Sequence, residues 1–372
     1  MQKAVSVPTD GLWTWEVFLL GGGSILTCLA CWAFSDKSMS VTTMSQLAFG
    51  LAFAVNHPHF LSSYVILYND LGANIMRRPR YFWAAVVVPV LLAGYLFYAL
   101  TSGRAQLIGH TVNTMYFLVG WHYVKQVFGC IIVTSARRRL FYKNWERRLM
   151  LGNLVALWSI SFLQSQTSSP SFTFYGIVYS GLQLDPFFLQ IAYAAVVISL
   201  MGVVGMHVRK YIYEGVQPTY GGMVAHAALY VWYLPAFSHP GYAYLIPFFH
   251  SLQYLVFVWS LKSNQVSDQI KDLAGPEARL GWITHFVGWG VAALVLGAMA
   301  FEFVPKSLDS QGLIHSSELG YSPVLVGFLL FINIHHYFID NVIWRSNNEL
   351  VKRYLFAAPV TEEPKSKSPR AA

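Results

Sequence analysis

The chain has 372 residues, of which 55% are hydrophobic and only 11% are charged. This balance indicates an integral membrane protein and leaves no soluble domain large enough to fold alone. The net charge of +8 could suggest a nucleic-acid partner. Because the basic residues are spread over short loops between apolar runs, we expect no nucleic acid and instead contacts with membrane lipid headgroups.

Ten apolar runs are candidate spans of a bilayer with ~30 Å of hydrocarbon, and the run over 221–236 is short for a span. We therefore predict an all-α fold: a polytopic membrane helix bundle of about ten transmembrane helices. It forms a single domain over residues 1–358, followed by a disordered cytoplasmic tail over 359–372. The runs lie near 13–34, 43–68, 82–101, 107–134, 149–165, 186–208, 221–236, 241–262, 280–302 and 322–344.

The distribution of Lys and Arg predicts the orientation. If successive loops lie on opposite sides, all of these residues share one side except Lys37, Arg104, Lys306 and Lys125, the last of which lies within a span. The positive-inside rule places that side, and both termini, in the cytoplasm. We expect a multi-pass protein of the bacterial inner (cytoplasmic) membrane.

Histidines recur at one depth in several spans. Ionisable residues inside a membrane are costly, so such a layer is by default a functional hypothesis. Each histidine precedes the cytoplasmic end of its span by about 9–13 residues, or roughly 14–20 Å. The layer contains His57, His59, His122, His250, His335 and His336.

The run over 43–68 carries Asn56-His57-Pro58-His59. Residues two apart point roughly 200° away from each other on a helix, so both imidazoles face one point only if Pro58 kinks or unwinds it. Ser62 and Ser63 follow where a hydroxyl could bond a freed carbonyl. We interpret both histidines as metal ligands. The alternative is a structural kink that turns one of them toward the headgroups.

The run over 107–134 carries His122, Lys125 and Gln126, which share one face of a helix at i, i+3 and i+4. We interpret His122 as a metal ligand. Lys125 and Gln126 are candidate catalytic residues that contact a bound oxygen species, substrate or carboxylate. The alternative for Lys125 is a buried ion pair with Asp340 that fixes helix packing.

The next two histidine-bearing runs supply further candidates. His226, one turn before Tyr230, reaches a shallower depth and is a possible metal ligand. His250 shares a helix face with Gln253 and Tyr254. We predict that His250 is a ligand, Gln253 its outer hydrogen-bond partner and Tyr254 a catalytic residue.

The last run carries His335, His336 and Asp340. Adjacent residues diverge by ~100°, so the two histidines could serve two metals or two sides of one, while Asp340 shares the face of His336. A carboxylate among histidines is a ligand mixture that non-haem iron favours, or the carboxylate orients a ligating histidine. Alternatively, these histidines cap a buried hydrogen-bond network.

These residues give the chain a resemblance to the histidine-rich integral-membrane non-haem iron enzymes. That group includes fatty-acid desaturases, alkane and sterol hydroxylases, and bacterial carotene-cleaving oxygenases. The resemblance implies two metal ions held by histidines and O2 used on a lipid-like substrate. Desaturase histidine boxes have longer spacings and lie largely in cytosolic segments, unlike these. The resemblance rests on the pairs His57/His59 and His335/His336 and on the single residues His122 and His250.

We therefore predict a membrane oxidoreductase with a histidine-ligated centre in the cytoplasmic half of the bilayer. Two non-haem iron ions would activate O2 to desaturate, hydroxylate or cleave an apolar substrate, with manganese, zinc or copper left open as the metal. An electron-donor protein or a quinol is an expected partner. Two alternatives are a haem-bearing electron-transfer protein with His226 and His239 as axial ligands, and a metal- or proton-coupled transporter.

Overall fold

The computed structural model describes residues 14–34, 41–234, 237, 239–273, 275–314, 316–345 and 347–356. Within these ranges the regular structure is helical apart from one short hairpin, so the predicted all-α class is confirmed. The hairpin pairs β1 (Ser171–Phe174) with β2 (Ile177–Ser180) in antiparallel register. The predicted tail over 359–372 lies outside the described residues.

Each of the ten predicted runs is helical where it is described, and several contain a π-helical turn. The first half of the chain forms α1 (Trp15–Val17), η1 (Phe18–Gly22), α2 (Gly23–Phe34), α3 (Val41–Leu51), η2 (Ala52–Asn56), α4 (His57–Val65), η3 (Ile66–Asp70), η4 (Gly72–Asn74), α5 (Pro79–Phe82), η5 (Trp83–Val87), α6 (Val88–Ser102), α7 (Ala105–Arg137) and α8 (Asn144–Ser168). The second half forms α9 (Pro186–Glu214), α10 (Tyr220–Tyr233), η6 (Pro240–Leu245), α11 (Ile246–Gln269), α12 (Gly275–Trp282), η7 (Ile283–Val287), α13 (Gly288–Ala298), η8 (Met299–Phe303), α14 (Val304–Ser310), α15 (Pro323–Ile343), α16 (Glu349–Val351) and η9 (Lys352–Phe356).

Proline opens and glycine closes several of these helices. Pro186 occupies the first turn of α9, where the Asp185 carboxylate accepts a hydrogen bond from the Phe187 backbone N–H at 2.8 Å. A proline loses no helical bond there, and the aspartate satisfies an otherwise free donor. Gly103 and Gly215 end α6 and α9 with φ of 71° and 66°, a conformation that glycine adopts at little cost.

Seven helical stretches in the described ranges are long and apolar enough to cross a membrane, which indicates an integral membrane protein. Three of the ten predicted runs do not meet that standard: α3 to η3, α8 and α10. The 14 residues of α10 rise only about 21 Å, less than the ~30 Å of hydrocarbon. The seven stretches are Trp15–Ala33, Pro79–Ser102, Ala105–Arg137, Pro186–Glu214, Gly241–Gln269, Gly275–Ser310 and Pro323–Ile343.

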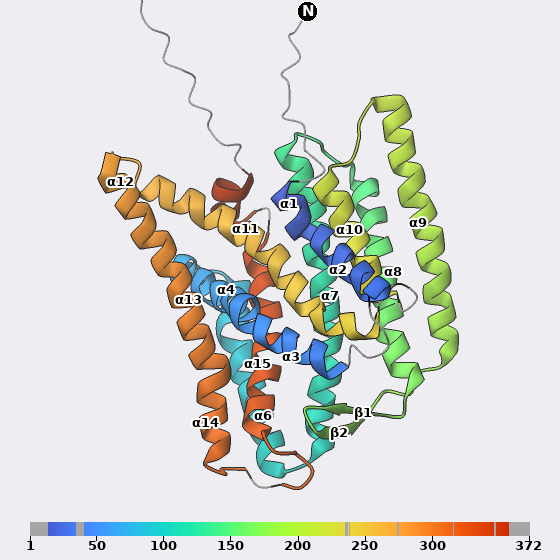
Figure 1. Ribbon diagram of the computed structural model, residues 1–372, viewed down its shortest axis with the longest axis vertical. Helices are drawn as coiled ribbons and strands as arrows, with labels where there is room; N and C mark the ends of the chain where they lie inside the picture. The colour runs from blue at the N-terminus through green and yellow to red at the C-terminus, as the bar shows by residue number, and fades with distance from the viewer. Residues whose placement is uncertain are drawn as a thin grey trace, which may run out of the picture.

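The helices form a bundle around α7 and α15, which pack against each other near its middle (Figure 1). α9 stands at one edge against α8, and α12 to α14 stand at the opposite edge, where α13 packs against α4. α11 and the α3–α4 segment cross the bundle obliquely. The described start of the chain, α1, lies at the upper end in this view, and β1 and β2 lie at the lower end.

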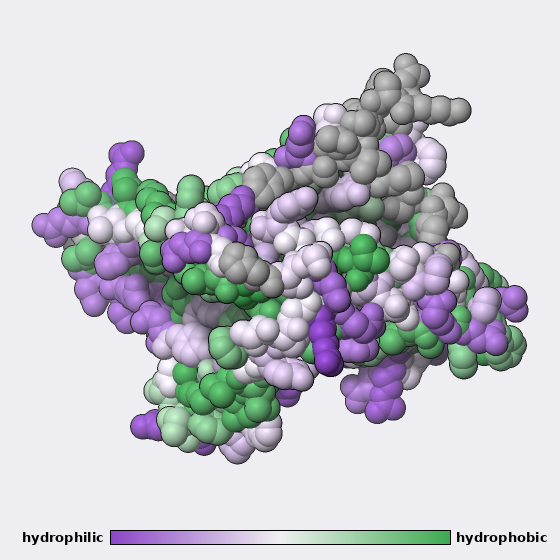
Figure 2. Space-filling model, turned by 90° about the horizontal axis from the view of Figure 1, so that it is seen from below, coloured by the Kyte–Doolittle hydropathy of each residue, from purple (hydrophilic) through white to green (hydrophobic). Residues whose placement is uncertain are grey.

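The inner and outer helices differ in how much of their apolar surface is covered. In the most apolar stretch of α15, 61% of the residues are buried, against 17% in α9. Seen from the hairpin end, hydrophobic patches and polar residues alternate around the edge of the molecule, and many residues of intermediate hydropathy lie across the middle (Figure 2). Outward-facing apolar helices around a more polar interior are what a bilayer requires.

Candidate metal centre

A π-helical turn precedes the first predicted ligand pair. Within η2 the His57 backbone N–H bonds the carbonyl of Ala52, five residues earlier. The helix continues through Pro58 as α4, and the Ser62 hydroxyl donates to the Pro58 carbonyl at 2.5 Å. The proline is therefore accommodated by a wider turn and a side-chain hydrogen bond rather than by unwinding.

The two histidines beside this proline face different surroundings. The centroid of the His59 ring lies 4.5 Å from that of His336, whereas the His57 ring packs against Phe53 and Phe301 at 4.9 and 5.5 Å. Because α4 stays helical, residues two apart keep their wide divergence. Pro58 does not aim both imidazoles at one point, contrary to the expectation from the sequence.

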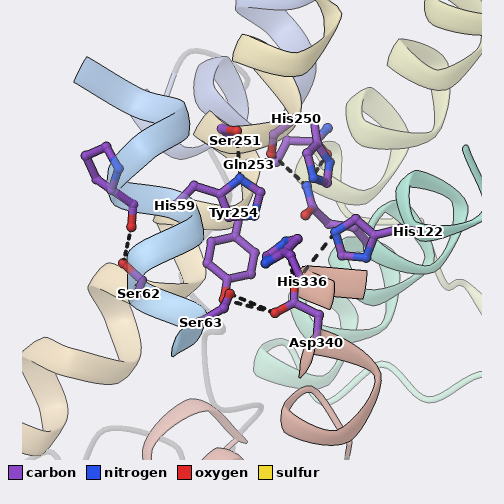
Figure 3. Close-up of polar contacts among 12 residues, drawn as sticks. His59, Ser62, Ser63, His122, His250, Ser251, Gln253, Tyr254, His336 and Asp340 are labelled. Carbon is purple, nitrogen blue, oxygen red and sulfur yellow. Dashed lines mark hydrogen bonds and ion pairs between the residues drawn. The ribbon is translucent and has the colours of Figure 1, made fainter. Parts of the chain in front are cut away.

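Four buried side chains converge in the middle of the bundle, and we call them the metal cluster. Each offers one ligand atom, and these atoms all lie within 4.8 Å of one another. They come from three helices far apart in the sequence, and Figure 3 shows them pointing toward one another. The metal cluster consists of His59 on α4, His122 on α7, and His336 and Asp340 on α15.

The spacing within the metal cluster fits a bound ion. Oδ2 of Asp340 lies 3.3 Å from Nε2 of His336 and 3.6 Å from Nε2 of His122. Two ligand atoms that each lie about 2.1 Å from a shared ion at a tetrahedral angle are about 3.4 Å apart. The i, i+4 spacing of the two α15 residues, predicted from the sequence to share a face, produces the shorter distance.

The ligand atoms of the metal cluster lack hydrogen-bond partners. Among the described residues, nothing bonds Nε2 of His59, His122 or His336, or Oδ2 of Asp340. Buried polar atoms are normally paired, and each unpaired one costs about 1–3 kcal/mol. Four such atoms aimed at one point are what a cation would satisfy, so the residues present fit a metal ion.

Hydrogen bonds behind the metal cluster hold two of its members in place (Figure 3). Nδ1 of His59 pairs with the Ser251 hydroxyl at 2.7 Å, which orients the ring. Oδ1 of Asp340 accepts from Ser63 at 2.8 Å and from Tyr254 at 3.3 Å, and these two hydroxyls also bond each other. Such outer contacts fix ligand geometry and are typical of metal sites.

His250 borders the metal cluster without belonging to its closest group. Its ring centroid lies 5.0 Å from His122 and 5.1 Å from His59, and it stacks on Tyr123 at 3.9 Å. Its Nδ1 has no hydrogen-bond partner among the described residues. It is therefore placed to extend the site by one ligand.

Two other predicted ligands lie apart and have partners of their own. Both ring nitrogens of His335 are bonded, Nδ1 with the Tyr64 hydroxyl at 2.8 Å and Nε2 with the Ala84 carbonyl at 2.9 Å. Nε2 of His226 bonds Oδ1 of Asn153 at 2.8 Å. His335 thus caps a local hydrogen-bond network, which is the alternative that the sequence left open for that position.

The predicted catalytic residues are divided between the site and the surface. Tyr254 touches the metal cluster through Asp340, and its ring lies 4.1 Å from that of His59. Gln126 adjoins the site by donating to the His250 carbonyl at 2.8 Å and to Gln253 at 3.1 Å. Lys125 is exposed, and the described residues contain no ion pair between it and Asp340.

The histidine pair considered for haem does not share a helix. α10 ends at Tyr233, and His239 caps the following η6 by accepting from the Gly241 N–H at 3.1 Å. His226 is held by Asn153 on a different helix. The described geometry therefore does not present these two residues as a ligand pair on one helix.

The outer contacts of the metal cluster are not predicted by the sequence. Ser251 follows His250 directly, and Tyr123 follows His122, but nothing local shows which ring each would meet. Ser63 lies one turn after His59 and was predicted only as a possible partner for a freed carbonyl. Its actual partner, Asp340, is 277 residues away in the chain.

No protein-family model, curated protein or solved structure matches this chain. Function must therefore be inferred from the site itself rather than from its relatives or its fold.

Proposed function

We propose that this protein is a membrane oxidoreductase in which the metal cluster binds non-haem iron and activates O2 to oxidise a lipid-like substrate. The reaction would be a desaturation, hydroxylation or oxidative cleavage. One observation carries the proposal: three buried imidazoles and one buried carboxylate offer ligand atoms that lie within 4.8 Å of one another and have no hydrogen-bond partner among the described residues.

The ligand set favours iron. Imidazoles with a carboxylate, and no thiolate, suit non-haem iron, although manganese, zinc and copper accept the same donors. A second ion, which the resemblance to membrane iron enzymes implied, would draw on His250 because its Nδ1 has no partner among the described residues. Three neutral imidazoles with one carboxylate also limit the charge placed in a buried site.

The chain's own residues would hold the iron and control protons beside it. Bound iron would supply the one-electron chemistry through which O2 reacts. Ser251 keeps the His59 ring in place through Nδ1, which leaves Nε2 free to bind. Tyr254 donates to Asp340, so its hydroxyl can hold or deliver a proton next to the carboxylate.

The position of the loops supports the proposed orientation, with ten spans and both termini in the cytoplasm. The connections over 138–143, 215–219 and 270–273 lie at the same end of the bundle as α1 (Figure 1). Arg137 to Lys143, Arg209, Lys210 and Lys271 gather at that end, as the positive-inside rule requires of the cytoplasmic side. We place the protein in a bacterial inner membrane.

The substrate would reach the site from the membrane. Outer helices such as α9 expose large apolar side chains along most of their length, so an acyl chain, sterol or isoprenoid can approach sideways. The reaction also needs electrons, for which we propose an electron-donor protein or a quinol.

Metal analysis and oxygen uptake test this function. The full-length protein, purified in detergent and loaded with Fe(II) without air, should retain stoichiometric iron and show no haem absorption band. Oxygen uptake should depend on the iron, on a reductant and on added lipid, and mass spectrometry of the lipid should show the oxidised product.

The matched variants are His122→Ala and His335→Ala. The first removes a residue of the metal cluster, and the second removes a neighbouring histidine whose nitrogens are already bonded. Loss of bound iron and of oxygen uptake in His122→Ala, with both retained in His335→Ala, supports the proposal. Tight zinc binding without any oxygen uptake would contradict it.

A further inference from the structure

A second site lies between α7, α8, α9 and α10. It is a cavity of about 420 Å³, and its walls are mostly apolar. Ile131 contributes to the wall from α7, nine residues after His122, so the cavity lies about 14 Å along that helix from the metal cluster. Its volume falls in the range of small-molecule sites, roughly 300–1,000 Å³.

A fixed polar group forms one part of the cavity wall. Oδ1 of the fully buried Asn153 accepts from Nε2 of His226 and from the Tyr230 hydroxyl, both at 2.8 Å. The Asn153 amide nitrogen donates to Ser199 at 3.1 Å and to the Val196 carbonyl at 3.5 Å. His226 and Tyr230 line the cavity, whereas Asn153 holds them from behind.

This network decides which nitrogen of His226 carries the proton. The Val196 carbonyl can only accept, so the amide nitrogen of Asn153 must face it and the amide oxygen must face His226. Nε2 of His226 therefore donates, and in the neutral ring Nδ1 is left as an acceptor. No hydrogen bond to that Nδ1 occurs among the described residues.

The rest of the cavity suits an apolar molecule that arrives from the membrane. Leu200, Met223 and Phe237 line it and are exposed at 37%, 42% and 52%, so the cavity continues onto the outer apolar surface. A second imidazole, His207, lines the same space, and its ring packs against Tyr142 at 5.9 Å. An apolar passage with an imidazole acceptor inside selects a hydrophobic ligand that carries a hydrogen-bond donor.

We propose that this cavity binds a lipid-soluble molecule whose hydroxyl group donates a hydrogen bond to Nδ1 of His226. Two membrane sources share this chemistry: a hydroquinone that carries electrons, and a long-chain or isoprenoid alcohol. Binding does not require the metal cluster, because none of its residues lines the cavity.

Ligand pairs that differ only in the hydroxyl group test the site. A decyl-substituted hydroquinone and tetradecanol, each beside its methyl ether, would be titrated by calorimetry into the full-length protein in nanodiscs. The hydroxyl form should bind about tenfold more tightly than its ether, since one hydrogen bond is worth that much. A preference confined to the hydroquinone assigns the site to an electron carrier, and one shared with the alcohol assigns it to hydroxylated lipids in general.

Variants of the wall complete the test. His226→Phe keeps a ring but removes the acceptor, so the ratio of the affinity for the hydroxyl form to that for its ether should fall to about one. Ala227→Trp should block the cavity, whereas Val204→Trp adds the same bulk at an exposed position outside it. Equal binding of ethers and parent compounds in the unaltered protein, or binding that survives Ala227→Trp, would overturn the proposal. The same titration in His336→Ala should give the same preference for the hydroxyl form, because binding in the cavity does not depend on the proposed metal centre.

Discussion

Two adjacent histidines on α15 differ in their hydrogen-bond partners, and this difference separates a proposed metal ligand from a structural residue. His336 has no hydrogen-bond partner on either ring nitrogen among the described residues, and its Nε2 faces Asp340. His335 has partners on both nitrogens, Tyr64 and the Ala84 carbonyl. The exposed fractions of the two side chains are nearly equal, 1% for His335 and 2% for His336. Burial and residue type therefore do not distinguish the proposed metal ligand from its neighbour, whereas unpaired ring nitrogens beside the other members of the metal cluster do.

Replacing each of these two histidines should give the largest contrast. His336→Ala should reduce metal affinity by more than the 10–100-fold typical of losing an outer partner, because it removes a ligand. His335→Ala should leave the bound metal in place. Elemental analysis of the two purified variants after equal exposure to Fe(II) measures the difference.

The control for this contrast is the folded state of both proteins. Circular dichroism and size-exclusion profiles should match those of the unaltered protein, because each change removes one side chain from the same helix. Equal metal content in the two variants would show that the lack of hydrogen-bond partners on His336 does not mark it as a metal ligand.

Removing the metal should lower stability in the unaltered protein. A ligand at 100 times its Kd stabilises the folded state by about 2.7 kcal/mol. We expect a chelator to lower the thermal unfolding midpoint by about 3–4 °C, and restored metal to raise it again. In His336→Ala the chelator should have no effect on the midpoint, and an equal shift there would place the metal elsewhere.

Two serine hydroxyls close to His59 make different kinds of contact. Ser251 orients His59 through Nδ1, whereas Ser62 only bonds the Pro58 carbonyl of its own helix. Ser251→Ala should weaken metal binding by about 10–100-fold, as for other outer partners, and Ser62→Ala should not. Competition with a chromophoric chelator measures both affinities. Equal affinities in the two variants would mean that the His59 ring is held by packing alone.

The sequence predicted the helices well because their cause is local. Length and apolar composition mark each of the ten runs, and each is helical where the structure describes it. The number of membrane spans is a separate question. The segment from α3 to η3, α8 and α10 are helical, but their composition or length does not require them to cross a bilayer.

The site was predicted only in part because its geometry is not local. Asp340 lies four residues after His336, and this spacing predicted that the two share one helix face, but it did not exclude His335 as a ligand. No comparable signal distinguishes His59 from His57, since the difference depends on where α11, α13 and α15 pack against α4. The bond between Ser63 and Asp340 joins residues from opposite ends of the chain and exists only in the folded protein.

Replacing Lys125 should have the smallest effect. It tests whether residues three apart on one helix, such as His122 and Lys125, must share the same site. Residues three apart differ by about 60° around a helix axis, enough for His122 to be buried while Lys125 is exposed. Lys125→Ala should therefore change metal affinity by about twofold or less, as exposed substitutions do. Gln126→Ala, which removes the bond to the His250 carbonyl, should have the greater effect on the same chelator competition. If Lys125→Ala lowers metal affinity more than Gln126→Ala does, the Lys125 side chain must reach the site. The prediction from the sequence that Lys125 contacts the site would then hold.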